Sequence, residues 1–68
     1  HLETKHQKTV VLELHDDLAA FGGNIKKLLK YKNKAMNDAA EKLDFERAAI
    51  VRDEILILER RLEENKKA

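Results

Sequence analysis

The chain reads MNDAAEKLDFERAAIVRDEI from Met36 to Ile55. Within it, two alanine pairs, Ala39-Ala40 and Ala48-Ala49, lie on either side of a short Leu-Asp-Phe-Glu segment. Alanine side chains let two helix backbones approach closely, and the segment between the pairs lets the chain reverse direction. The stretch therefore predicts an antiparallel helical hairpin. Because so thin a hairpin buries little of its own surface, we expect its apolar side chains to meet a partner.

The first helix of the hairpin is predicted over about residues 25–43, with Asn24 as a favourable N-cap. Its apolar face consists of Ile25, Leu28, Leu29, Ala35, Met36, Ala39, Ala40 and Leu43. Lys32 interrupts this face. With the turn at Asp44, Lys32 comes opposite Leu56, one turn from Glu59. We therefore predict a Lys32–Glu59 ion pair, the alternative being that Lys32 extends to water.

The second helix of the hairpin is predicted over about residues 45–65, with Asp44 as its N-cap. It has a broad apolar face made of Phe45, Ala48, Ala49, Val51, Ile55, Leu56, Leu58 and Leu62. Ile50 and Ile57 lie on its other side, so this helix needs two contacts. One contact is the preceding helix, and the second is either an N-terminal helix or another molecule.

An additional N-terminal helix is predicted over about residues 9–21. Val10, Leu14, Leu18 and Phe21 recur at helical spacing, and Gly22 suits the C-terminal cap because glycine tolerates a left-handed conformation. A short strand over residues 9–14 is the alternative. Residues 1–8 are expected to be frayed or extended. The fold class is therefore all-α, with residues 1–23 flanking a hairpin domain over residues 24–68.

The length of the chain makes oligomerisation or partner binding attractive. It has 68 residues and no cysteine, so no disulfide stabilises it. A single core of this size supplies only about 3–5 kcal/mol. Self-association or docking on a partner is the remaining source of stability.

Positive charge is concentrated in one segment, although the formal net charge is only +1. Residues 26–34 contain five lysines and no acid, and four of them share the polar face of the predicted helix: Lys26, Lys27, Lys30 and Lys34. Such a face can contact nucleic-acid phosphates, although a solvated lysine face is the commoner explanation. The acidic pairs Asp16-Asp17 and Glu63-Glu64 are interpreted as solvated helix charges.

Catalysis is not expected from this composition. The chain lacks serine and cysteine, and Gly22-Gly23 lacks the ending of a phosphate-binding loop. Glu3, His6 and His15 have no spacing that enforces a metal site. We predict no cofactor, no metal, no small-molecule substrate and no membrane span, and we expect a cytoplasmic protein.

The segment from about Leu29 to Leu58 resembles the UVR domain shared by the B and C subunits of the bacterial UvrABC excinuclease. The matching positions are Leu29, Met36, Ala39-Ala40, Leu43-Asp44-Phe45-Glu46, Ala48-Ala49, Arg52-Asp53, Ile55 and Leu58. Lys32 departs from the pattern, which usually has leucine there. Residues 1–23 lie outside the resemblance.

The resemblance implies a non-catalytic hairpin that associates in pairs, as a homodimer or with a similar hairpin of another protein. It points to nucleotide excision repair, with an adaptor of the Clp protease system as the alternative. Phe45 is expected to anchor the interface, and Arg52 and Asp53 to exchange ion pairs across it or to remain a solvated pair. The predicted interface residues are Met36, Ala40, Leu43, Phe45, Ala48, Ala49, Ile50, Arg52, Asp53 and Ile57.

Overall fold

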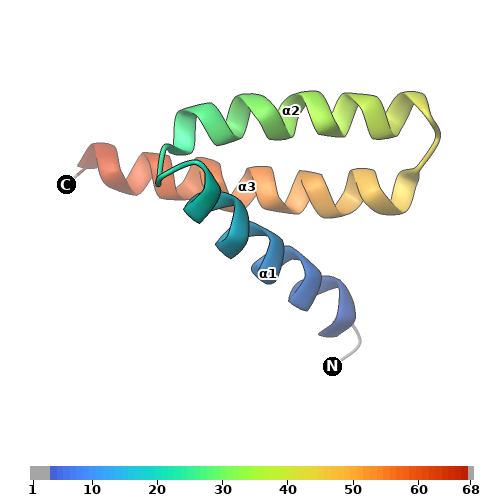
Figure 1. Ribbon diagram of the computed structural model, residues 1–68, viewed down its shortest axis with the longest axis horizontal. Coiled ribbons are helices and arrows are strands. Elements are labelled where there is room, and N and C mark those ends of the chain that lie inside the picture. The colour runs from blue at the N-terminus through green and yellow to red at the C-terminus, as the bar shows by residue number, and fades with distance from the viewer. Residues whose placement is uncertain (1–3, 68) are drawn as a thin grey trace.

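The computed structural model describes residues 4–67, which form three α-helices: α1 (Thr4–Ala20), α2 (Ile25–Glu41) and α3 (Phe45–Lys67). α2 and α3 lie side by side and antiparallel, and α1 crosses α3 obliquely (Figure 1). The predicted all-α hairpin with an extra N-terminal helix is confirmed. The strand alternative for residues 9–14 is wrong, because these residues belong to α1. Residues 4–8 are also helical, so the expected fraying does not apply to them, and residues 1–3 lie outside the described residues.

Two tight turns of the same kind connect the helices. After α1, the N–H of Gly23 donates to the carbonyl of Leu18 (2.8 Å) and that of Gly22 to Ala19 (3.1 Å), with φ of 61° at Gly22. This pair of bonds defines a Schellman cap, in which glycine fills the left-handed position. Asn24 then caps α2, because its Oδ1 accepts from the N–H of Lys27 (3.0 Å). The predicted caps at Gly22 and Asn24 are therefore present.

The main core lies at the end of the hairpin where α1 joins it. Val10 and Leu14 of α1 are buried against Leu28 of α2 and Leu58 of α3. Five partly buried side chains pack around this cluster: Leu18, Phe21, Ile25, Leu29 and Ile50. α1 thus supplies the second contact of α3 and covers part of the surface that the sequence assigned to an outside partner.

The seam of the hairpin is narrower than the sequence predicted. Ala39 is buried, as are Val51 and Ile55. Leu56, which was placed on the apolar face of the last helix, is instead exposed. The far end of the hairpin consists of the ends of α2 and α3 and the turn between them (Figure 1).

Candidate functional site

The turn between α2 and α3 forms the hairpin tip, residues 41–45. The N–H of Asp44 donates to the carbonyl of Ala39 (2.8 Å) and that of Leu43 to Ala40 (3.0 Å), which repeats the Schellman pattern of the first turn. Here, however, leucine occupies the left-handed position, with φ of 61° at Leu43. Asp44 caps α3, because its Oδ1 accepts from the N–H of Arg47 (3.2 Å).

This backbone leaves two large apolar side chains in water. Leu43 is 71% exposed and Phe45 is 68% exposed, on either side of the capping Asp44. A left-handed leucine is strained by about 1–2 kcal/mol relative to an ordinary conformation. The tip therefore combines backbone strain with uncovered apolar surface, which is a combination found at recognition sites.

The structure distributes the other predicted interface residues over two regions. Near the tip, Ala40 is exposed, while Met36, Ala48 and Ala49 are half-buried. The remaining members lie further along α3. Ile50 packs against the main core, and Ile57 lines an apolar groove beside Val11 of α1.

Arg52 and Asp53 already have partners within the chain. Nε2 of His6 lies 2.6 Å from Oδ2 of Asp53, and Nη2 of Arg52 lies 3.2 Å from Oδ1 of the same carboxylate. The hydrogen bond with His6, aided by Arg52, holds the pKa of Asp53 below its usual value. Pairing of Arg52 and Asp53 across an interface stays a prediction.

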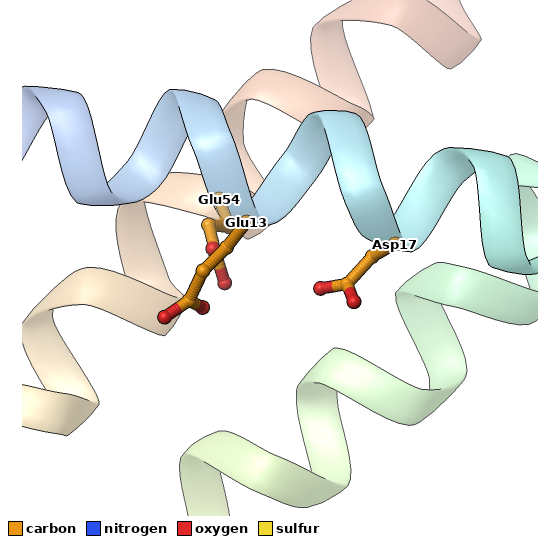
Figure 2. Close-up of side chains that lie close together, drawn as sticks. All are labelled: Glu13, Asp17 and Glu54. Carbon is orange, nitrogen blue, oxygen red and sulfur yellow. The ribbon is translucent and has the colours of Figure 1, made fainter.

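A charge cluster between the helices was not predicted from the sequence. Nζ of Lys32 lies 2.6 Å from Oδ2 of Asp17, 2.8 Å from Oε1 of Glu54 and 3.8 Å from Oε1 of Glu13. Glu13 also accepts two hydrogen bonds from the guanidinium of Arg47, at 2.6 and 2.8 Å. Figure 2 shows Glu13 and Asp17 extending from α1 and Glu54 from α3 toward a shared space. The cluster (Glu13, Asp17, Lys32, Arg47 and Glu54) thus links all three helices.

Burial and charge oppose each other at the two most buried members of the cluster. Glu54 is 0% exposed and Lys32 only 2%. Neither oxygen of Glu54 has a well-oriented hydrogen bond within the described residues, so its short contact with Lys32 is charge attraction without a directed bond. Burial therefore dominates and raises the pKa of Glu54 to about 7, although Lys32 opposes the shift. Burial also acts to lower the pKa of Lys32, but the attraction of its ammonium to the carboxylates of Asp17 and Glu54 outweighs burial and raises that pKa.

The cluster brings together three carboxylates that have the spacing of a cation site: Glu13, Asp17 and Glu54, whose oxygens lie within 4.8 Å of one another. The ammonium of Lys32 is within 3.8 Å of all three. The chain thus supplies its own cation at this position. The cluster is a structural clamp between α1 and the hairpin.

Two sequence-based interpretations are wrong here. Lys32 pairs with Glu54 and Asp17, whereas its predicted partner Glu59 is exposed. Asp17 is not a solvated helix charge, because it contacts a buried ammonium. The available signal for Glu54 was its position among Val51, Ile55 and Leu58, which form one buried helical face.

The lysine face (Lys26, Lys27, Lys30 and Lys34) is exposed along the outer side of α2. No described residue forms an ion pair with any of the four lysines. The face lies in the first half of α2, at the opposite end of the hairpin from the tip (Figure 1).

The fold and the tip define a small helical-hairpin module with one clamping helix. Residues 25–61 match the UvrB/uvrC motif (UVR), and the chain belongs to this family. Similar proteins include the UvrABC system protein C of Kocuria rhizophila, 46% identical over 54 residues, and that of Mycolicibacterium smegmatis, 42% identical over 62 residues. These matches cover 78% and 91% of the chain but only 8% of each relative. No solved structure gives a significant match.

The similarity to the relatives extends into α1. A match of 62 residues in a chain of 68 necessarily includes residues 7–62. The UVR motif itself begins at residue 25, so residues 1–23 lie outside that motif as expected, although the similarity to the Mycolicibacterium smegmatis protein includes most of α1. The matched range contains every member of the charge cluster. Of the described helices, none has the length and apolar character required to cross a membrane.

Proposed function

We propose that this chain is a protein-interaction module of a nucleotide excision repair protein and that it binds a second hairpin of its own kind through the tip. The repair context rests on UVR family membership and on relatives that are UvrABC system proteins C. Those relatives favour repair over the alternative of a Clp-system adaptor. The docking role rests on the tip itself.

The observation that carries the docking role is the exposure of both Leu43 and Phe45 at a strained turn. Aromatic residues surrounded by small or apolar neighbours are frequent centres of binding energy. Exposed Ala40 lies three residues before Leu43, and half-buried Ala48 lies three residues after Phe45, so small side chains on both helices let a partner helix approach closely. Of the predicted interface, this region (Ala40, Leu43, Phe45 and Ala48) is the part we propose as its centre.

Phe45→Ala tests this proposal. Truncation of a central aromatic residue is expected to weaken binding by about 2 kcal/mol or more, with little change in folding because the ring is mostly in water. Binding is measured by sedimentation equilibrium for self-association and by calorimetry for the hairpin of the B subunit, which the resemblance implies as a partner.

Leu56→Ala is the matched control, because Leu56 is also an exposed apolar residue of α3 but lies three turns from the tip. Its truncation should leave both affinities unchanged. Normal binding by Phe45→Ala together with a loss in Leu56→Ala would move the interface away from the tip and refute the proposal.

A further inference from the structure

The lysine face groups four exposed lysines on one side of α2. Lys26, Lys30 and Lys34 follow one another at four-residue steps, so their Cα atoms are spaced by about 6 Å along α2. The first acidic residue of α2 is Asp38, one turn beyond Lys34. Among the residues the structure describes, no carboxylate pairs with these lysines. Lys32, by contrast, is turned inward and neutralised by the charge cluster.

An aromatic ring lies beside this charge and is held in place from within. Tyr31 is four residues after Lys27 and three before Lys34, so these two lysines are its neighbours on the helix surface. Its ring centroid lies 5.5 Å from that of half-buried Phe21, at an interplanar angle of 48°, and 6.0 Å from Nζ of Lys32. Tyr31 nevertheless remains 55% exposed. The ring is therefore both fixed and accessible.

We propose that this surface binds single-stranded nucleic acid, with Tyr31 stacking on an unpaired base and Lys27 and Lys34 contacting the flanking phosphates. Binding of single strands without sequence preference combines a positively charged track with aromatic side chains on which bases stack. The ring favours single strands over duplex, since the bases of a duplex are already stacked on one another. The surface is separate from the hairpin tip, so this inference does not depend on the proposed docking function.

Intrinsic fluorescence provides a direct test of the stacking. Tyr31 is the one tyrosine of the chain, and the chain has no tryptophan, so tyrosine emission reports on this ring alone. Titration with oligo(dT) of about 12 nucleotides, a site size typical of small single-strand binders, should quench the emission saturably at low salt. A duplex of equal length should bind more weakly and quench little. Unchanged emission at saturation, with binding followed by the anisotropy of labelled oligo(dT), would overturn the proposal.

Variants of Tyr31 separate stacking from simple charge attraction. Tyr31→Phe retains a ring and should bind labelled oligo(dT) as the parent does, whereas Tyr31→Ala should lose about ten-fold in affinity. Circular dichroism verifies that both variants stay folded. If Tyr31→Ala is folded and binds normally, the ring is not a stacking platform and the proposal fails.

A matched pair of double variants tests the phosphate contacts. Lys27→Gln with Lys34→Gln removes two charges beside Tyr31, and Lys8→Gln with Lys66→Gln removes two exposed charges on other helices. Because each single-strand phosphate contact contributes about 0.7 to the slope of log K against log salt, the first pair should reduce that slope by about 1.4. The second pair should leave it nearly unchanged. If both double variants reduced the slope equally, any exposed lysine would serve. The proposed contacts of Lys27 and Lys34 with phosphates would then be refuted.

Comparing oligo(dT) with oligo(rU) tests whether the sugar of the strand contributes to binding. Stacking and phosphate contacts alone predict similar quenching by both, because the 2′-hydroxyl is what lets a protein tell RNA from DNA. Duplex binding as tight as single-strand binding, without quenching of Tyr31, contradicts the proposal for either polymer.

Discussion

Nζ of Lys32 and Oε1 of Glu54 lie 2.8 Å apart at a position from which water is excluded, since neither side chain is more than 2% exposed. Removing one partner of a buried ion pair leaves an uncompensated charge, whereas replacing both by apolar residues of similar volume is often neutral. The pair joins α2 to α3, and Asp17 extends it to α1.

Lys32→Met is therefore expected to destabilise the chain severely. Above pH 7, where Glu54 is ionised, the loss of the ammonium leaves Glu54 and Asp17 without their cation, at a cost of about 3–5 kcal/mol. That cost is comparable to the whole stability of about 3–5 kcal/mol expected of so small a core. Urea denaturation followed by circular dichroism measures the effect, and exposed Lys34→Met should change stability by less than about 0.5 kcal/mol.

The double variant Lys32→Met/Glu54→Leu distinguishes an ion-pair effect from a packing effect. It should recover most of the lost stability, since Asp17 is partly exposed and can turn to water. A single variant Lys32→Met as stable as the parent would mean that the cluster does not clamp the helices.

The stability of the chain should fall as the pH rises from about 4.5 to about 7, because of the raised pKa of Glu54. Its pKa is about 7 in the folded chain and 4.5 when unperturbed. Between these values the folded state binds more protons than the unfolded state, so the free energy of unfolding decreases with rising pH. Each unit of pKa shift corresponds to about 1.4 kcal/mol.

Two other carboxyls act in the opposite direction at lower pH. The hydrogen bonds from Arg47 lower the pKa of Glu13, and the contact with His6 lowers that of Asp53. Their contributions are present above their unperturbed values, 4.5 and 3.8, and are lost as the pH falls through the lower folded values. The maximum of stability is therefore expected at about pH 5.

Urea unfolding at several pH values and constant ionic strength tests this profile. The His6→Gln background is used, so that the contact between His6 and Asp53 does not contribute to the profile. Adding Glu54→Gln should flatten the decline between pH 5 and 7. An unchanged slope would show that another group causes the decline.

The helices and their caps were predictable because their signals are local. The apolar spacing of Val10, Leu14 and Leu18, and the capping oxygens of Asn24 and Asp44, act within one or two turns of chain. The tip was predictable for the same reason. The left-handed conformation of Leu43 was not, because leucine rarely adopts it.

The charge cluster was not predictable because it depends on register and on the crossing of α1. A turn centred on Leu43 places Lys32 eleven residues before it and Glu54 eleven residues after it, so the two lie opposite each other. The prediction placed the turn at Asp44, which put Lys32 opposite Leu56 and so nearer to Glu59. Glu13 and Asp17 reach Lys32 only because α1 crosses the hairpin (Figure 1). Helical periodicity specifies which face of α1 is buried but not the angle at which it crosses.

The ion pair between Arg47 and Glu13 should contribute measurably to the docking of α1. The pair is bidentate and partly buried, and such geometry is more favourable than that of a typical surface pair. A double-mutant cycle with Glu13→Gln and Arg47→Met should give a coupling of about 1 kcal/mol.

The adjacent pair Arg52–Asp53 is the control for this cycle. It is a longer contact between neighbouring residues, and Arg52 is largely exposed, so its coupling should be near zero. Equal couplings for the two pairs would contradict a special contribution of Arg47 to the packing of α1.

Leu43→Gly should make the chain more stable while weakening its binding to a partner. Glycine adopts φ of 61° without the strain that leucine suffers there, so the free energy of unfolding should rise by about 1 kcal/mol. The same change deletes an exposed apolar side chain from the tip, so partner affinity should fall.

Leu43→Ala separates these two effects, because alanine removes the side chain but keeps the strained backbone. It should weaken binding as Leu43→Gly does, without the gain in stability, when both are compared by urea denaturation and sedimentation equilibrium. If the glycine variant is no more stable than the alanine variant, the turn is not strained at Leu43. If both variants bind a partner more weakly and only the glycine variant is more stable, then Leu43 lowers the stability of the fold and raises the affinity for the partner. That outcome is expected of a side chain whose contribution is to binding.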